Sequence, residues 1–123
     1  MRIKLSPLDI LFSKFIRLRA IKRVHGCERC RAWKENYKQL QCSHFHSRRK
    51  LSVRYDEDNC NGFCFGCHQY FAENHVEYAL WMIQQLGEEA FNMLNGRMRI
   101  IGKIDKAALT LYYQEQLRKM EEK

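Results

Sequence analysis

Two Cys-x-x-Cys pairs constrain the fold of this 123-residue chain more than any other feature of its sequence. The pairs are Cys27/Cys30 and Cys64/Cys67, and residues 31–63 separate them. Each pair can direct two thiolates at one ion, and two pairs complete the tetrahedral shell that structural zinc prefers. Because the interval exceeds that of a minimal zinc finger, we expect a folded unit between the pairs. Ligation of an iron–sulfur cluster and simple burial of the thiols are the alternatives.

The expected cellular compartment favours zinc over disulfide bonds. The N-terminal residues have neither the long apolar core nor the small-residue cleavage site of a secretory signal, and no apolar stretch is long enough to cross a membrane. We therefore expect a cytoplasmic protein whose thiols stay reduced. The two remaining cysteines, Cys42 and Cys60, are expected to be small buried hydrophobic residues.

The positive charge of the chain is concentrated in its N-terminal part. The net charge is +8; residues 1–54 contain 15 Lys/Arg against 3 Asp/Glu, which leaves +12, whereas residues 55–123 contain 7 against 11, which leaves −4. A one-sided basic surface suits a polyanion, whose phosphates release counterions when they are neutralised. The charge predicts a nucleic-acid partner, with a solvated basic face as the alternative.

The length and the periodicity of apolar residues predict one small α+β domain over residues 1–123. We expect an N-terminal basic helix over 7–24, a zinc-stapled core over 26–86 and a C-terminal helical arm over 88–123. No Gly/Ser linker or internal repeat divides the chain. The core is therefore expected to be flanked by helices on both sides in the sequence.

Within the core, residues 40–55 have the pattern of a β-hairpin or of two short strands, with 47–50 as a basic turn. After a polar loop over 56–59, a helix should begin near Cys67 or His68, pause around Asn74 and continue to Leu86.

Cap signals mark the flanking helices: Ser6 and Asp9 fit a capping box, Gly87 a C-cap, Asn95-Gly96 the end of a short helix, and Asp105 the N-cap of the last one. Four aromatic residues are expected in the core, namely Trp33, Trp81, Tyr112 and Tyr113.

Three polar residues stand in a recognisable order within this frame. His44 lies on the expected strand, Asn59 in the loop before the second cysteine pair, and His68 directly after Cys67. The order resembles that of the HNH nucleases, whose ββα-metal unit is often carried on a two-pair zinc site. That resemblance implies His44 as a general base working near its ordinary pKa, His68 as a ligand of the catalytic metal, and Asn59 as the residue that fixes the strand–loop geometry. Each of the three, taken singly, also has a purely structural explanation.

Four longer stretches resemble the phage recombination nuclease family called NinG or Rap: "PLDILFSKFIRLRA", "CSHFHSRR", "VRYDEDNCNGFCFGCHQY" and "EYALWMIQQLGEEAFNML". Members of that family are structure-specific endonucleases of branched DNA, so the resemblance implies cleavage of recombination intermediates such as Holliday junctions and D-loops, in a bacterial or phage-infected cell. It implies Mg²⁺ or Mn²⁺ at the catalytic centre beside the structural zinc. For contacts with DNA we predict Arg17, Arg48, Arg49, Lys50 and Arg54.

One position departs from the HNH pattern. Many of these enzymes have an acidic metal ligand just before the base histidine, where this chain has Ser43. The second ligand of the catalytic metal is therefore open, with His46, Asp56 and Asp58 as candidates. We expect His75 to contact phosphate or to lie at the surface.

Pairing of two subunits is also left open. A zinc-stabilised module that binds nucleic acid without cutting it is the strongest alternative, and a zinc-stapled assembly protein is a third.

Overall fold

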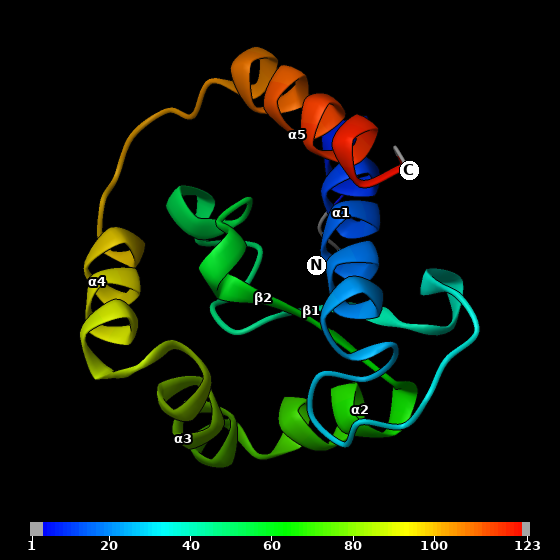
Figure 1. Cartoon of the computed structure of the whole chain (residues 1–123). Helices are drawn as coiled ribbons and strands as arrows, with labels where there is room; N and C mark the ends of the chain where they lie inside the picture. The colour runs from blue at the N-terminus through cyan, green and yellow to red at the C-terminus, as the bar shows by residue number, and fades with distance from the viewer. Residues whose placement is uncertain (1–3, 122–123) are drawn as a thin grey trace.

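A two-stranded antiparallel sheet lies between two groups of helices in the structure, a computed structural model that describes residues 4–121 (Figure 1). The strands are β1 (Gln41–His44) and β2 (Cys60–Phe63), paired so that His44 stands opposite Cys60. The helices are α1 (Pro7–Val24), α2 (Phe65–Glu73), α3 (His75–Leu86), α4 (Glu88–Met98) and α5 (Lys106–Glu121). The expected small α+β class is confirmed, while residues 1–3 and 122–123 of the predicted domain lie outside the described part.

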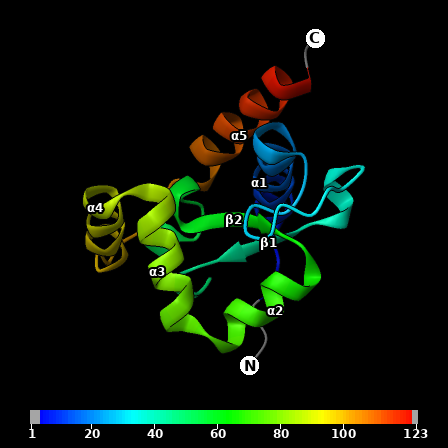
Figure 2. The same cartoon turned by 60° about the horizontal axis from the view of Figure 1, so that its bottom comes forward.

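The helices cover opposite faces of the sheet. Helix α1 packs on one face with α5 alongside it, and α2 and α3 lie across the other face (Figure 2). Side chains alternate accordingly: Cys42 and Cys60 join the apolar cluster around α1 and α5, whereas Phe63 joins the cluster around α2, α3 and α4. Both thiols are buried as expected, with exposed fractions of 8% and 0%. No helix among the described residues is long and apolar enough to cross a membrane.

Helix α1 has the boundaries that its cap residues predict. The Ser6 hydroxyl accepts the Asp9 backbone N–H, and the Asp9 carboxylate accepts the Ser6 N–H, which completes the capping box. Its inward face carries Phe12, Ile16 and Ala20, all of them at most 1% exposed. A Cβ added at Gly62 of β2 would lie 2.6 Å from the Ala20 Cβ, so a glycine at this position lets α1 approach the sheet closely.

The structure corrects the predicted strand pairing. The partner of β1 is Cys60–Phe63, not a segment before Tyr55, and the intervening residues form a long loop with two short 3-10 helices (Leu51–Val53 and Glu57–Asn59). Helix α2 begins at Phe65, earlier than expected, because the Cys64 side chain accepts the Cys67 N–H as an N-cap. Helix α4 continues through Asn95-Gly96 to Met98.

Two of the four expected core aromatics are exposed. Tyr113 is 2% exposed and Trp81 is half-buried, as predicted. Tyr112 is 45% exposed and its hydroxyl donates to Glu57 at 3.3 Å, and Trp33 is 67% exposed. The remaining predicted ends hold: the Gly87 N–H caps α3 by bonding to the Ile83 carbonyl, and the Asp105 carboxylate accepts the Ala108 N–H at the start of α5.

An ion pair fastens the long loop to α1. The guanidinium of Arg54 donates from Nε and Nη2 to the two oxygens of Asp9, at 2.9 and 2.8 Å, and both side chains are largely buried. Burial alone would raise the pKa of Asp9, but the hydrogen bonds from Arg54 and Ser6 outweigh it and lower that pKa to about 2. Asp9 is therefore ionised at neutral pH and depends on Arg54 for its charge partner.

We expect Arg54→Ala to lower the free energy of unfolding by about 3 kcal/mol, because it leaves a buried carboxylate without its cation. Lys14→Ala is the matched control: it removes a surface pair with Glu121, at 3.1 Å, and should cost less than about 1 kcal/mol. Denaturant unfolding measures both. The effect of Arg54→Ala should be fully present above pH 3.8, the ordinary pKa of the Asp9 carboxyl, and should fade as the pH falls towards 2. Equal losses for the two variants would contradict the assignment.

Candidate metal centre and adjoining cleft

The four cysteines of the two pairs come together in space. Their Sγ atoms all lie within 4.8 Å of one another, and those of Cys30 and Cys64 are 3.8 Å apart. Four sulfurs at the ordinary Zn–S distance of about 2.3 Å stand about 3.8 Å from one another in a tetrahedron. The group formed by Cys27, Cys30, Cys64 and Cys67, called the tetrad below, could therefore hold a metal ion.

Local backbone structure presents both pairs. In the first turn the Arg31 N–H bonds to the Cys27 carbonyl at 2.9 Å, and Arg31 adopts a left-handed φ of 65°. Gly26 is required there, because a Cβ on it would lie 2.0 Å from the Ala32 carbonyl oxygen. The second pair flanks the start of α2, where Cys64 is the N-cap and Cys67 lies in the first turn. A strand end and a helix start thus fix the second pair, and a tight turn fixes the first.

Two residues between Cys27 and Cys30 tie the first turn to the rest of the domain. Arg29 donates to the Cys67 Sγ at 3.4 Å, and its guanidinium lies 4.5 Å from the ring centre of Tyr70. Glu28 accepts the Gly62 N–H at 2.9 Å and donates its own N–H to the Gly62 carbonyl at 3.0 Å. Neither the contact of Arg29 with Cys67 nor that of Glu28 with Gly62 was predicted from the sequence. A cation between the cysteines of the first pair, such as Arg29, is nevertheless a signal of a partner for an anionic thiolate cluster.

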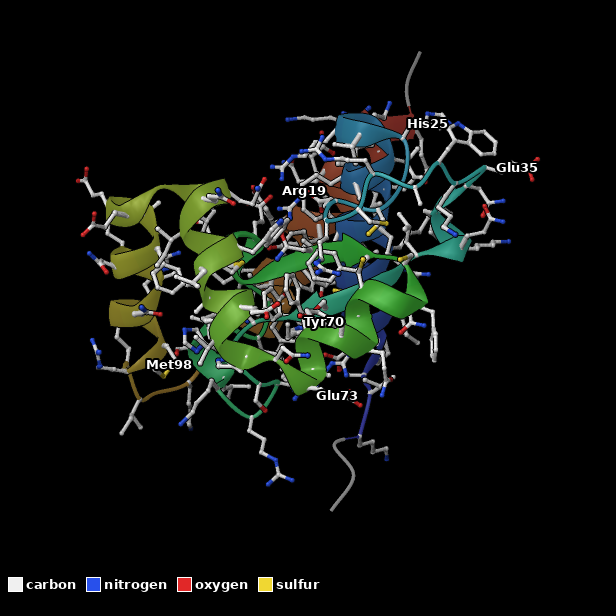
Figure 3. All side chains as sticks on the ribbon, turned by 90° about the horizontal axis from the view of Figure 1, so that it is seen from below. Arg19, His25, Glu35, Tyr70, Glu73 and Met98 are labelled. Carbon is white, nitrogen blue, oxygen red and sulfur yellow. The ribbon has the colours of Figure 1, made fainter. Side chains whose placement is uncertain are left out.

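A cleft of about 320 Å³ opens beside α2, and its lining includes His68, the residue that follows Cys67 of the tetrad. Figure 3 views the molecule from the side of α2, on which Tyr70 and Glu73 are labelled. Two of the predicted site residues, His44 and His68, line this cleft together, and so does His75. The other lining residues are Ser43, Phe45, Ser47, Phe71, Ala72 and Tyr78.

His44 ends β1 and is held in one orientation. Its Nε2 lies 2.9 Å from the Arg54 carbonyl oxygen. Since a carbonyl only accepts, Nε2 carries the proton, and Nδ1 of the neutral ring keeps a free lone pair. Burial and the nearby charge of Arg48 both lower the pKa of His44, and although the hydrogen bond to the Arg54 carbonyl raises it in part, the net pKa is about 4. The expectation of an ordinary pKa was therefore wrong, and His44 is neutral at physiological pH.

Asn59 fixes the loop that follows β1. Its side-chain oxygen accepts the His46 N–H at 2.8 Å, and its amide nitrogen donates to the carbonyls of His46 and Val53 at 3.0 and 3.1 Å. The residue is 0% exposed, so each of these bonds forms away from water. Among the described residues, the side chain of Asn59 forms its hydrogen bonds with backbone groups, and it therefore fixes the path of the chain at His46 and Val53.

His68 lies in the first turn of α2 with its ring half-buried. Its Nδ1 is buried and has no hydrogen-bond partner among the described residues. Burial lowers the pKa of His68, and the charge of Arg48 lowers it in the same direction. Arg48 is therefore close to both histidines, and its own Nε is likewise buried without a partner in the described part of the chain. Unpaired buried donors and acceptors of this kind are costly unless a ligand completes them.

The candidates for a second metal ligand lie elsewhere. His46 Nε2 bonds to Asn95 of α4 at 2.8 Å and does not line the cleft. Asp56 and Asp58 both pair with Arg97, at 2.7 and 3.2 Å. His75 takes their place in the cleft, where its ring stacks on Phe45 at 4.7 Å. None of the three predicted candidates lines the cleft with His68, and their role as metal ligands stays a prediction.

A second group of possible ligands lies on the α1 face of the sheet. One ring nitrogen of His44 and the sulfurs of Cys42 and Cys60 lie within 4.8 Å of one another. Register explains this proximity, because His44 stands opposite Cys60 and Cys42 is two residues earlier on the same face. These three residues are called the trio below.

The predicted DNA contacts divide into three kinds. Arg48 adjoins the cleft, while Arg49 and Lys50 line a neighbouring groove together with Arg99. Arg17 bonds to the Ser13 carbonyl and lies 5.1 Å from the Tyr37 ring centre, half-buried on α1. The fifth residue, Arg54, forms an ion pair with Asp9, and its contact with DNA stays a prediction.

Comparison with known proteins adds a family to this geometry. The family model described as bacteriophage lambda NinG protein matches residues 6–123. No curated protein and no solved structure matches the chain. Because the family match extends over nearly the whole chain, the chain belongs to the family of the bacteriophage lambda NinG protein.

Proposed function

We propose that this chain is a metal-dependent DNA endonuclease of the HNH type and that it cuts branched recombination intermediates. One observation carries the proposal: a neutral His44, whose Nε2 bonds to the Arg54 carbonyl, lines the same cleft as His68, whose Nδ1 is buried with no hydrogen-bond partner among the described residues. A base and a ligand are the two groups that metal-assisted hydrolysis of a phosphodiester needs. The order of β1, β2 and α2 along the chain, with His44 at the end of β1 and His68 in the first turn of α2, supports the HNH assignment.

We propose zinc as the ion of the tetrad. Four thiolates at tetrahedral spacing suit zinc, and a closed set of four protein ligands is typical of structural sites. The bound ion would leave a net charge of −2, which the Arg29 guanidinium at Cys67 offsets in part. Zinc would then hold the start of α2, and therefore His68, against the end of β2.

A second metal ion fits the cleft in a limited way. The unpartnered Nδ1 of His68 offers one ligand, and His75 lines the same cleft, but no carboxylate does among the described residues. Imidazole favours Mn²⁺ and other transition ions over Mg²⁺, which prefers oxygen. Such an ion, held by His68 with His75 nearby, would stabilise negative charge on the phosphodiester and the leaving oxygen. The donor set thus favours Mn²⁺ within the predicted pair of metals.

The side chains of the chain would divide the remaining work. His44 would take a proton from the attacking water at Nδ1, while Nε2–H stays bonded to the Arg54 carbonyl and keeps the ring in place. Asn59 would position this ring indirectly, by fixing the loop at His46 and at Val53, the residue before Arg54. The guanidinium of Arg48, whose buried Nε has no hydrogen-bond partner in the described part of the chain, would bind a phosphate oxygen of the DNA.

The choice of DNA as substrate rests on charge and on family membership. The basic part of the chain supplies the loop with Arg48, Arg49 and Lys50. A preference for branches follows from the family alone. A zinc-stabilised binding module remains the second candidate, because the same charge would serve it, but it does not account for the unpartnered nitrogens in the cleft.

Metal analysis tests the tetrad. Protein purified without chelator should contain about one zinc per chain, and Cys27→Ser should lose it together with the folded core, because metal binding supplies folding energy in so small a domain. Cys42→Ala and Cys60→Ala are the matched controls, since both cysteines are buried outside the tetrad. They should retain one zinc. A folded, zinc-free wild type would overturn the assignment. If the wild type bound two zinc ions and each control variant bound only one, the second ion would be assigned to the trio.

Substitution of His44 separates an enzyme from a binding module. His44→Ala should keep zinc and DNA affinity yet lose cleavage by about 100-fold or more, the usual worth of a positioned base. His68→Ala should raise the Mn²⁺ concentration needed for half-maximal cleavage. His46→Ala is the control, and its metal response should stay normal because the ring faces α4. Plasmid nicking and cleavage of a labelled junction measure these effects. Near-normal cleavage by folded His44→Ala would remove the mechanism.

The pH profile of kcat/KM gives His44 an independent readout. Only the neutral ring accepts a proton, so activity falls as the pH drops through the pKa of His44. With that pKa at about 4, activity should stay level between about pH 5.5 and 7. An enzyme whose base had the ordinary pKa of histidine would already lose activity across this range. Arg48→Ala should move the acid limb upwards by removing a neighbouring positive charge. Zinc content at each pH shows whether the tetrad stays intact.

Salt dependence tests the basic loop. Combined replacement of Arg48, Arg49 and Lys50 by Ala should weaken DNA binding and lower the slope of log K against log salt by about 2 to 3, since each lost phosphate contact removes about 0.9. The matched control replaces three exposed cations of the C-terminal part, Lys103, Lys106 and Lys119, and should leave the slope nearly unchanged. Filter binding across a salt series measures both. Identical slopes for the two triple variants would contradict phosphate contact by this loop.

A further inference from the structure

Trp33 stands out on the surface because nothing in the described fold covers it. Its side chain is 67% exposed, although tryptophan carries more apolar area than any other residue. It lies three residues after Cys30, in the segment 25–34 that closes the first cysteine turn. Figure 3 shows this segment at the outer edge of the molecule, between the labelled His25 and Glu35. Packing within the chain therefore does not explain the residue.

The indole is held in place by the turn beneath it. The His25 ring stacks under it at 5.5 Å, with 17° between the ring planes. A β-bridge joins Gly26 to Trp33, and the Lys34 N–H bonds to the His25 carbonyl at 3.1 Å. The tetrad fixes the same turn through Cys27 and Cys30. The imidazole of His25 thus covers part of one face of the indole. The rest of the Trp33 side chain, which is 67% exposed, stays available to a partner.

Five cations lie close to this ring pair in the sequence. Lys22, Arg23, Arg31 and Lys38 are exposed and Lys34 is half-buried, all from the end of α1 or the segment after it. Arg23 lies 3.5 Å from Glu28, whereas the other four have no ion pair among the described residues. Glu35 is the exposed acid of this region. The surface therefore combines a preformed aromatic face with an excess of positive charge.

We propose that Trp33 and His25 form a stacking platform for an unpaired base of single-stranded DNA, with the surrounding cations binding the adjoining phosphates. Base pairs inside a duplex have both faces covered by neighbouring pairs, so an exposed indole stacks more readily on a base that is unpaired. Stacking tolerates any base and needs no hydrogen-bond code, which suits unpaired nucleotides at a branch point. This role deepens the proposed endonuclease function and rests on it for the choice of DNA.

The position of the platform fits that role. It belongs to the same turn as Cys27 and Cys30, and the tetrad joins this turn to the first turn of α2, where His68 follows Cys67. The tetrad thereby connects the turn that carries Trp33 to the helix that carries His68. A DNA strand that stacks on Trp33 would therefore have a defined position relative to the cleft. The platform would place the unpaired side of a branch at a set distance from the scissile strand.

Binding of a fluorescent oligothymidine in the absence of added divalent metal tests the platform. Trp33→Ala should weaken binding by about 10-fold, whereas Trp33→Phe should recover most of the affinity because it keeps an aromatic face. Affinity for a blunt duplex should not change. Phe65→Ala is the matched control, since Phe65 is also 67% exposed but lies at the start of α2, and it should bind as the wild type does. Circular dichroism and zinc content should be the same in all four proteins.

Fluorescence provides a second readout. The chain has two tryptophans, so a Trp81→Phe protein reports on Trp33 alone, and oligothymidine should quench its emission. Absence of quenching, or Trp33→Ala binding like the wild type, would overturn the platform even if the protein cuts DNA. Near-normal cleavage by folded His44→Ala, or no cleavage by the wild type, would overturn the proposed nuclease and leave these binding results untouched, so the two proposals fail separately.

Discussion

The geometry of the cleft depends on the convergence of two cysteine pairs that lie far apart in the sequence. Residues 31–63 must leave the first pair and return to the second, and the antiparallel pairing of β1 with β2 achieves that return. Strand β2 ends one residue before Cys64, and Cys64 caps α2. The tetrad therefore joins the end of β2, the start of α2 and the turn with Cys27 and Cys30. The position of His68 depends on this junction because His68 follows Cys67 directly.

Arg54 links the fold to the chemistry of the cleft through two of its groups. Its guanidinium pairs with Asp9 at the start of α1, and its backbone carbonyl faces Nε2 of His44. The ion pair thus helps to fix the position of the Arg54 carbonyl. This carbonyl accepts the proton of Nε2 and so selects the tautomer of His44. Asn59 fixes the same loop from the inside through Val53, the residue before Arg54. A residue predicted to bind DNA has a larger role as a support for the proposed base.

Sequence patterns predicted the elements with local signals and missed those set by tertiary contacts. The capping box of Ser6 and Asp9 is local, and α1 has the expected boundaries. Strand β2 reads Cys-Asn-Gly-Phe, which contains no β-branched residue, and its strand character comes from pairing with β1 and from the close approach of α1 at Gly62. The low pKa of His44 depends on burial beneath α1, which no spacing in the sequence expresses.

The sparse ligand set of the cleft implies a mode of regulation for the proposed enzyme. One buried imidazole nitrogen on His68, with His75 nearby and no carboxylate among the lining residues, would hold a divalent ion weakly on its own. Phosphate oxygens of bound DNA would supply the missing hard ligands, and Arg48 would favour their approach. Metal affinity would then rise when DNA occupies the cleft. Hydrolysis would be coupled to the presence of a correctly placed strand, because the catalytic centre is completed by its substrate.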